Sequence, residues 1–211
     1  MISASTTNSS SIAGIFVSAS ANHNITNNTL KNITANTTNI GTSSSTPVVG
    51  ILTASSGTAQ LINNNIVFNI FSNNTTAAVN VVGILTPGGS TAGSQVIGNR
   101  NYGLKNESNG VGAVVIGINN VGGLWTIANN MISLNNGASS SSSQCFGIND
   151  IGNNGARKYF YNSIHIYGTA PSAAVSAAFQ FRRVVATGTA EIKNNIFNNI
   201  RTGGNDYAVL I

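Results

Sequence analysis

The sequence predicts an all-β protein, a right-handed parallel β-helix of about six coils, and three observations support this. An asparagine pair inside an apolar run recurs along the chain, as in LINNNIVFNI at residues 61–70. A glycine within a short apolar strand, as in VVGILT, recurs with the same period. The composition is dominated by Ile, Val, Thr, Asn, Ser and Gly, which favour strands and turns and disfavour helix interiors.

The residue two positions before each asparagine pair marks the repeat. The aligned series is Ile25, Ile62, Val96, Ile127, Phe160 and Ile192, with intervals of 37, 34, 31, 33 and 32 residues. The glycine landmark precedes the first five of these at Gly14, Gly50, Gly83, Gly117 and Gly147, and AAFQFRR takes its place in the sixth copy. Two landmarks with one period indicate a repeat architecture, and the composition argues against the helical arrays that share this period.

Each unit is expected to contain three short strands. The first carries the glycine, the second ends at the asparagines, the third follows them, and a loop rich in Ser, Thr, Asn and Gly closes the unit. One coil cannot bury its inward side chains alone, but stacked coils form a continuous apolar core with equivalent positions about 4.8 Å apart. We therefore expect residues 1–211 to form a single β-solenoid domain, as a segment of a longer repeat protein or as a stacking subunit.

The asparagine pair is predicted to form a corner. One residue of each pair would donate its amide N–H to the equivalent asparagine of the next coil, and the other would adopt the left-handed backbone conformation of a sharp bend. The predicted ladder is Asn27, Asn64, Gly98, Asn129, Asn162 and Asn194. The predicted bends are Asn28, Asn65, Asn99, Asn130, Ser163 and Asn195. Gly98 should then be a missing rung that weakens the third coil.

Two inward apolar columns should accompany this corner. One is the aligned series that contains Ile25 and Phe160, and the other follows the corner at Leu30, Val67, Ile132 and Phe197. A register slip of one residue would exchange the inward and outward faces.

Charged residues are scarce and limit the possible functions. They make up 6% of the chain, against about 25% in ordinary globular proteins, so solubility rests on neutral polar groups. The net charge of +5 comes from dispersed residues, with no basic run longer than Arg157-Lys158 or Arg182-Arg183, which argues against nucleic acid as a ligand. The single Cys145 excludes an intramolecular disulfide, and no segment has the length and apolarity of a transmembrane helix. If the protein is exported, its signal is expected to lie outside this sequence.

Catalysis on such a fold would require two or three converging carboxylates. The acidic residues are Glu107, Asp150, Glu191 and Asp206, and only Asp150 and Asp206 could share a face. These two, with Arg182, are the weak catalytic candidates, and turn capping is the favoured interpretation of the aspartates. A calcium cage cannot be built from so few acids, and His23 and His165 lack partners at metal spacing, so no metal or cofactor is expected.

A basic groove is a second hypothesis. Arg157, Lys158, Arg182, Arg183 and Lys193 could together bind an acidic glycan. The alternative is that they are solvated cations, with Lys158 and Glu191 forming an exposed ion pair of little energetic value. Trp125, Tyr159, Phe160 and Tyr161 are expected to pack in the core or stack on one another rather than on sugars.

The segments RKYFYNSIHIYGTAPSAAVSAAFQFRR and TAEIKNNIFNNIRTGG, with the recurring pattern of glycine strand and asparagine pair, carry a family resemblance. The chain resembles the pectin-lyase-like right-handed β-helix repeats of very large secreted Bacteroidota surface proteins, which are often exported by type IX secretion. The resemblance covers essentially all six units and implies an extracellular or cell-surface location.

Taken with the scarcity of acids, this leads us to expect a non-catalytic structural or adhesive segment. Its partner would be an extracellular glycan or a cell-surface component, without membrane insertion. One alternative is a carbohydrate-active β-helix that binds or cleaves an acidic polysaccharide. Another is a filament subunit that assembles by end-to-end stacking of coils.

Overall fold

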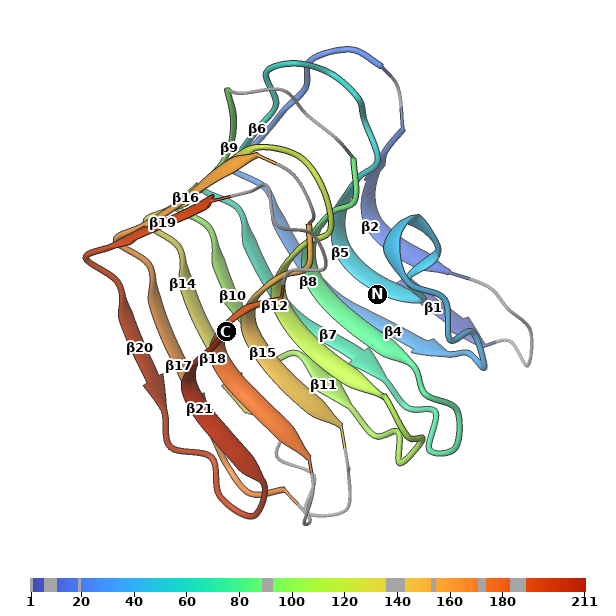
Figure 1. The fold of residues 1–211 in the computed structure, drawn as a ribbon. Helices are drawn as coiled ribbons and strands as arrows, with labels where there is room; N and C mark the ends of the chain where they lie inside the picture. The colour runs from blue at the N-terminus through green and yellow to red at the C-terminus, as the bar shows by residue number, and fades with distance from the viewer. Residues whose placement is uncertain are drawn as a thin grey trace.

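The chain folds as a parallel β-solenoid built from three sheets (Figure 1). The computed structural model describes residues 2–5 (backbone only), 11–18, 20–88, 93–135, 143–152, 155–170, 174–182 and 189–211. Within these residues the one helical element is a short 3-10 turn, η1 (Ser43–Ser45). The all-β prediction is therefore confirmed.

The strands fall into three sheets, which we name A, B and C. Sheet A contains β1 (Ile2–Ser5), β4 (Thr29–Asn36), β7 (Ile66–Ser72), β10 (Arg100–Tyr102), β14 (Met131–Asn135), β17 (Ser163–Tyr167) and β20 (Ile196–Asn199), with β11 (Lys105–Asn106) paired to β7. Sheet B contains β2 (Ile12–Val17), β5 (Val48–Thr53), β8 (Asn80–Thr86), β12 (Val114–Asn120), β15 (Gln144–Asp150), β18 (Val175–Phe181) and β21 (Asn205–Leu210). Sheet C contains β3 (Asn24–Thr26), β6 (Leu61–Asn63), β9 (Ser94–Ile97), β13 (Trp125–Ala128), β16 (Ala156–Phe160) and β19 (Thr189–Lys193).

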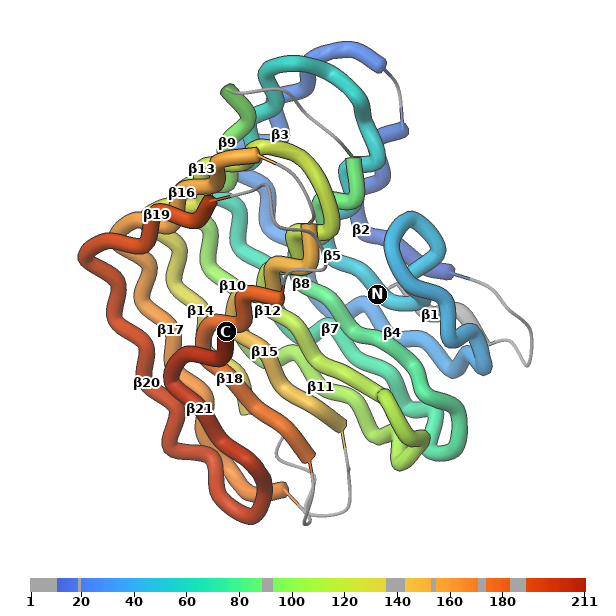
Figure 2. The backbone as a smooth tube through the Cα atoms, in the orientation of Figure 1, coloured from blue at the N-terminus to red at the C-terminus, as the bar shows by residue number. Residues whose placement is uncertain are grey.

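Each turn of the solenoid passes through sheets B, C and A in that order, and each strand pairs in parallel with its equivalents one turn away. Figure 2 shows the successive turns lying side by side along the stack. The three predicted strands per unit are confirmed, and β18 occupies the place of the glycine strand in the last repeat. Ala178 stands there at the position that Gly147 occupies one turn earlier.

The glycines of sheet B allow sheets A and B to approach one another. A Cβ atom built on Gly83 would lie 2.6 Å from the carbonyl oxygen of Gly117 and 3.2 Å from Asn101. A Cβ atom on Gly50 would lie 2.4 Å from Val67 of sheet A. At these positions glycine is needed for lack of space, because the neighbouring coil and the facing sheet fill the room that a side chain would take.

The inward columns follow the prediction in most coils. Ile25, Ile62, Val96 and Ile127 are buried and in register. The next member is Tyr159, because Tyr159 and not Phe160 pairs with Ile127. The predicted Phe160 is thus shifted by one residue and is only half-buried. Ile192 continues the column in the last coil, where it is 36% exposed.

The sheet A column contains one polar residue that the prediction lacked. Leu30, Val67, Ile132 and Phe197 lie in the column as expected. Ile164 fills the fifth coil, and the buried Asn101 fills the third. The Asn101 amide donates to the carbonyl oxygen of Gly117 at 3.3 Å across the core.

The asparagine corner exists, but the roles within each pair are the reverse of those predicted. The first residue makes the bend: Asn27, Asn64, Gly98, Asn129, Tyr161 and Asn194 all have positive φ, between 54° and 69°. The second residue makes the ladder, which runs through Asn28, Asn65, Asn99, Asn130, Asn162 and Asn195. Of the predicted ladder residues only Asn162 is a rung, and Ser163 is not a bend but the first residue of β17.

The ladder is continuous through the third coil. Each interior rung accepts hydrogen bonds at its Oδ1 atom from the backbone N–H and the Nδ2 group of the preceding rung, as Asn99 does from Asn65 at 2.9 Å in both cases. Its own Nδ2 group donates to a backbone carbonyl one coil back, for Asn99 that of Ile62. Gly98 is therefore a bend rather than a missing rung, and the expected weak point does not exist. Five complete turns separate Asn28 from Asn195.

Candidate functional site

The two aspartates that could have formed a catalytic pair lie apart. Asp150 ends β15 and points into the core, where its carboxylate lies 3.5 Å from the Arg157 guanidinium and accepts hydrogen bonds from the Tyr159 hydroxyl and the backbone N–H of Gly152. The side chains of Asp150 and Arg157 are fully buried. Asp150 is thus part of a buried ion pair within the solenoid.

Asp206 belongs to a different part of sheet B. It pairs in register with Ser176, whose hydroxyl donates to its carboxylate at 2.5 Å, whereas Asp150 pairs with Phe181 at the other end of β18. The backbone N–H of Arg182 donates to the Asp150 carbonyl oxygen, and the Arg182 side chain is exposed. The proposed cluster of Asp150, Asp206 and Arg182 is not formed.

The predicted basic groove is also dispersed. Arg157 is buried in the core, Lys158 lies on the outer face of sheet C, and Arg182 lies at the end of sheet B. Lys193 pairs with Glu191 within its own strand, which lowers the pKa of Glu191 and raises that of Lys193.

Lys158 and Glu191 are neighbours in register, as expected, but the ion pair of the structure joins Glu191 to Lys193. Arg183 lies outside the described residues.

The aromatic residues singled out in the sequence divide between core and corner. Trp125 and Tyr159 are buried in the core, in agreement with the prediction, and the edge of the Tyr159 ring meets Phe179. Tyr161 is exposed because it occupies the bend of its corner. These residues do not form a sugar-stacking surface.

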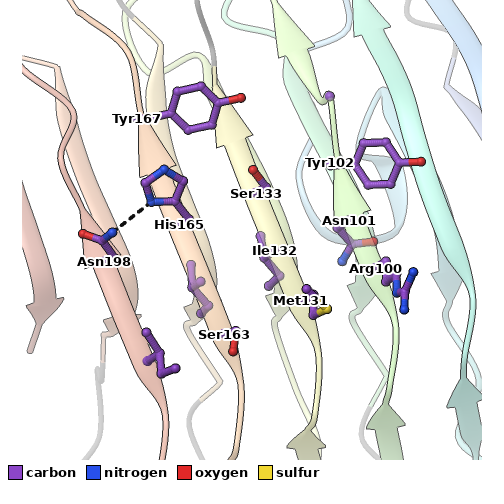
Figure 3. Close-up of a pocket in the computed structure, with 13 residues that line it drawn as sticks. Arg100, Asn101, Tyr102, Met131, Ile132, Ser133, Ser163, His165, Tyr167 and Asn198 are labelled. Atoms are coloured by element: carbon purple, nitrogen blue, oxygen red, sulfur yellow. Dashed lines mark hydrogen bonds between the residues drawn. The ribbon is translucent and has the colours of Figure 1, made fainter.

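The outer face of sheet A contains a groove that sequence reasoning missed. Its volume is about 550 Å³, and it spans β10, β14, β17 and β20 (Figure 3). The outward side chains that line it are Arg100, Tyr102, Met131, Ser133, Ser163, His165, Tyr167, Ile196 and Asn198. Met131 and Ile196 are more than half exposed. This groove is the candidate functional site.

A regular register creates the lining of the groove. Tyr102, Ser133, His165 and Asn198 are consecutive partners across four parallel strands, so they form one row on the outer face. Figure 3 shows the small Ser133 side chain between Tyr102 on one side and His165 and Tyr167 on the other. The row is therefore hollowed at Ser133 and walled by rings.

Stacking fixes the rings that wall the groove. Tyr102 stacks on Phe68 of the preceding coil with ring centroids 5.1 Å apart, and His165 stacks on Tyr167 at 5.0 Å. A hydrogen bond of 3.1 Å joins the Asn198 amide to Nδ1 of His165. The groove is consequently bounded by side chains that already have partners in the free protein.

A backbone irregularity separates the first three coils from the others. Asn32, Asn69 and Gly103 interrupt β4, β7 and the segment after β10 with φ of 59°, 53° and 63°. A side chain at Gly103 would meet the Asn69 amide oxygen at 3.0 Å. The later strands β14 and β17 contain no such residue, so the groove lies where the shape of sheet A changes.

The outer face of sheet A carries positive charge. Lys31, Arg100 and Lys105 project from it, and Lys105 also lies over the Phe71 ring and pairs with Glu107 at 3.0 Å. The residues that line the groove include Arg100 and no carboxylate. The site therefore favours neutral or anionic ligands over cationic ones.

Two buried acids make the stability of the fold sensitive to alkali. Burial raises the pKa of the Cys145 thiol to about 12, from an ordinary value of 9.0, and burial together with the Asp150 carboxylate raises the pKa of Tyr159 well above 10.0. The folded state thus keeps two protons that the unfolded chain releases in alkali. The contribution of Cys145 to stability is complete below pH 9 and that of Tyr159 below pH 10, and each is lost as the pH rises above that value.

We expect the free energy of unfolding to fall above pH 9, by up to about 1.4 kcal/mol per pH unit for each group. Urea denaturation from pH 8 to pH 11 measures this decrease. Cys145→Ala should make the decrease smaller, and an identical pH dependence in that variant would contradict the assignment.

The described residues contain no cluster of three or more His, Cys, Asp or Glu side chains placed to hold a metal ion. Over the same ranges, no helix is long and apolar enough to span a membrane. No family model, curated protein or solved structure matches the chain. The class of protein is therefore defined by the fold itself, a parallel β-solenoid with an asparagine ladder.

Proposed function

We propose that the chain is a non-catalytic structural and adhesive β-solenoid segment of a secreted or cell-surface protein. The observation that carries this proposal is that all four carboxylates of the chain have partners. Asp150 lies with Arg157, Asp206 with Ser176, Glu107 with Lys105 and Glu191 with Lys193. Acid/base or nucleophilic chemistry on a glycan needs two carboxylates that converge on one substrate, and these four lie in four different places in the fold.

The mechanism of such a segment is mechanical. Parallel hydrogen bonds join every coil to the next in three sheets, and the asparagine ladder adds a continuous line of buried hydrogen bonds at one corner. Each coil therefore supports its neighbours, as in other repeat proteins. The result is a stiff body that presents loops and outer faces to a partner.

The likeness to the pectin-lyase-like repeats of secreted Bacteroidota proteins supports an extracellular location. The low charge content, with neutral amides and hydroxyls on the surface, is consistent with a display role. The partner we propose is an extracellular glycan or another cell-surface component.

A turnover assay tests the non-catalytic proposal. The purified chain is incubated with polygalacturonate and with neutral polysaccharides, and new reducing ends and unsaturated products are measured. We expect no product above that of the buffer, and no difference between the chain and its Asp206→Asn variant. Release of product that depends on Asp206 would overturn the proposal.

A second candidate function is a self-assembling filament, favoured by one specific observation. The last coil exposes the apolar side chains of Ile192, Ile196, Ile200 and Val209. Head-to-tail contacts of this kind generate open filaments.

Light scattering and electron microscopy over a range of concentrations test assembly. Thin rods with the coil axis along the fibre would support the filament. A monomer at all concentrations would exclude it and leave the structural role in place.

A further inference from the structure

We propose that the groove on the outer face of sheet A binds a small planar aromatic carboxylate. The aromatic ring of this ligand would lie over Ser133, between Tyr102 and His165, and its carboxylate group would pair with the Arg100 guanidinium (Figure 3). This binding function goes beyond the structural and adhesive role of the chain and does not depend on it.

The row of side chains that contains Ser133 carries rings on both sides of it. Phe68 and Tyr102 are neighbours in register, and their rings are nearly parallel, with an angle of 10° between the planes and centroids 5.1 Å apart. Ser133 follows on the next strand, and His165 follows Ser133. A hydroxymethyl group thus interrupts a row of rings at one position.

The spacing of the strands leaves a place for one ring at this position. Neighbouring parallel strands lie about 4.8 Å apart, so a ring over Ser133 would have its centroid about 5 Å from the rings of Tyr102 and His165. Aromatic pairs prefer centroid distances of about 4.5–7 Å. The contact between Phe68 and Tyr102 has this spacing on the same face. A planar ligand would therefore complete the row.

Arg100 gives the site its preference for an anion. It lies two residues before Tyr102 on β10 and is exposed, and the four carboxylates of the chain all lie with other partners. A guanidinium group can form two parallel hydrogen bonds with one carboxylate group. Because no carboxylate lines the groove, an anionic ligand would meet no like charge there.

The size and the remaining lining of the groove suit a small molecule. Its volume of about 550 Å³ is within the range of about 300–1,000 Å³ that is usual for small-molecule sites. Met131 and Ile196 supply apolar contacts, and the Met131 thioether can also contact the edge of an aromatic ring. Apolar contacts with a few convergent polar groups are the usual composition of such a site.

Binding would require little ordering of the side chains beside the ligand. Phe68 contacts the Tyr102 ring, and the Asn198 amide bonds Nδ1 of His165, before any ligand arrives. Side chains that already have fixed positions lose less conformational entropy when a ligand binds. The two walls of the gap are therefore formed in the free protein.

Charge argues against two other occupants of the groove. A second copy of the chain is disfavoured because Lys31, Arg100 and Lys105 of the same face would oppose one another. Single-stranded nucleic acid also stacks on aromatic side chains, but it needs a positively charged groove along its backbone. Arg100 is the one lysine or arginine among the lining residues, which is enough for a single carboxylate.

Titration of the full chain with 2-naphthoate tests the proposal by calorimetry and by NMR. The comparison ligands are 2-naphthamide, which lacks the charge, and decahydro-2-naphthoate, which lacks the aromatic rings. We expect 2-naphthoate to bind at least tenfold more tightly than either of them. Nuclear Overhauser effects from its ring protons to the ring protons of Tyr102 and His165 should place it in the gap.

Three variants alter the site in different ways. Ser133→Phe supplies the missing ring from the chain itself, so it should abolish binding and raise the midpoint of thermal unfolding. Tyr102→Leu removes one ring and should weaken binding at least tenfold. Arg100→Gln should reduce the affinity for 2-naphthoate to that for 2-naphthamide. Circular dichroism establishes that each variant is folded before its binding is interpreted.

The matched controls are Tyr161→Asn and Arg182→Gln. They remove an exposed tyrosine and an exposed arginine outside the groove, and asparagine is the residue that most other corners use at the left-handed position of Tyr161. Binding of 2-naphthoate by both controls should be unchanged.

Four results would overturn the proposal. They are no binding of 2-naphthoate, equal binding of decahydro-2-naphthoate, binding by Ser133→Phe or Arg100→Gln as tight as that of the controls, and tighter binding of an oligothymidine that displaces 2-naphthoate. The last result would assign the groove to nucleic acid. Sedimentation of the free chain adds a further check, since a dimer that 2-naphthoate dissociates would assign the groove to a second copy. None of these results would alter the turnover assay or the non-catalytic structural role.

Discussion

Arg157→Ala should lower the free energy of unfolding by about 3–5 kcal/mol, because it leaves the buried Asp150 carboxylate without its cation. The Asp150 side chain would retain the hydrogen bonds from Tyr159 and Gly152, which do not supply a compensating charge. Urea denaturation of the variant and the parent chain measures the difference.

Two further variants separate the ion pair from general effects of arginine removal. Arg182→Ala removes an exposed arginine of the same region, and we expect a change within about 0.5 kcal/mol. The double variant Arg157→Met with Asp150→Leu removes both charges and should recover much of the loss. If Arg157→Ala were as mild as Arg182→Ala, the buried pair would not have the importance assigned to it.

Asn99→Ala should cost about 3–5 kcal/mol, because it breaks the ladder at a central rung. The Asn99 Oδ1 atom accepts from both the backbone N–H and the side-chain amide of Asn65, and its Nδ2 group donates to the carbonyl of Ile62. Alanine leaves these buried groups unsatisfied, at about 1–3 kcal/mol for each. Thermal and urea denaturation measure the loss.

Asn36→Ala is the matched control for the ladder. Asn36 is an exposed asparagine of β4 and should tolerate the change with an effect near zero. A loss below 1 kcal/mol for Asn99→Ala would show that the ladder is not a major source of stability. Substitution of the rung Asn28 should cost less than Asn99→Ala, because Asn28 is half-buried whereas Asn99 is fully buried.

The three strands per coil could be predicted from the sequence, because the glycine and the asparagine pair mark most of the turns. The roles within the pair could not be assigned from most coils, since either asparagine can adopt a left-handed conformation or form a ladder. Two positions held the answer. Gly98 stands where the other pairs have their first asparagine, and glycine is the residue that most readily adopts positive φ. Tyr161 precedes the single Asn162, which aligns that asparagine with the second member of the other pairs.

The wrong placement of Phe160 in the inward column also results from aligning the fifth coil on the wrong asparagine position. Tyr159 lies three residues before the rung Asn162, as Ile127 lies three before Asn130, so an alignment on the ladder places Tyr159 in the core. Arg157 is then on the inward face with Tyr159, since side chains two apart in a strand share a face. A basic residue is normally assigned to the surface, and only the position of Asp150 in the facing strand shows why this one is buried.

The sheet A groove depends on features that a single strand does not reveal. Its row combines residues from four coils, and it begins at the last of the coils that contain the bends at Asn32, Asn69 and Gly103. Serine at position 133 looks like any other polar residue of this chain. Its importance follows from the rings on the strands at either side.

The turns between successive rungs have unequal lengths of 37, 34, 31, 32 and 33 residues, yet the ladder geometry stays the same. The differences in length are therefore absorbed by the loops, while the corner keeps a constant rise of about 4.8 Å per coil. The asparagine corner thus sets the distance between coils, and the loop residues determine what each coil presents to a partner. Evolution could therefore exchange or lengthen the loops of such a protein to bind new partners. Each loop would still lie at a fixed interval along the solenoid axis.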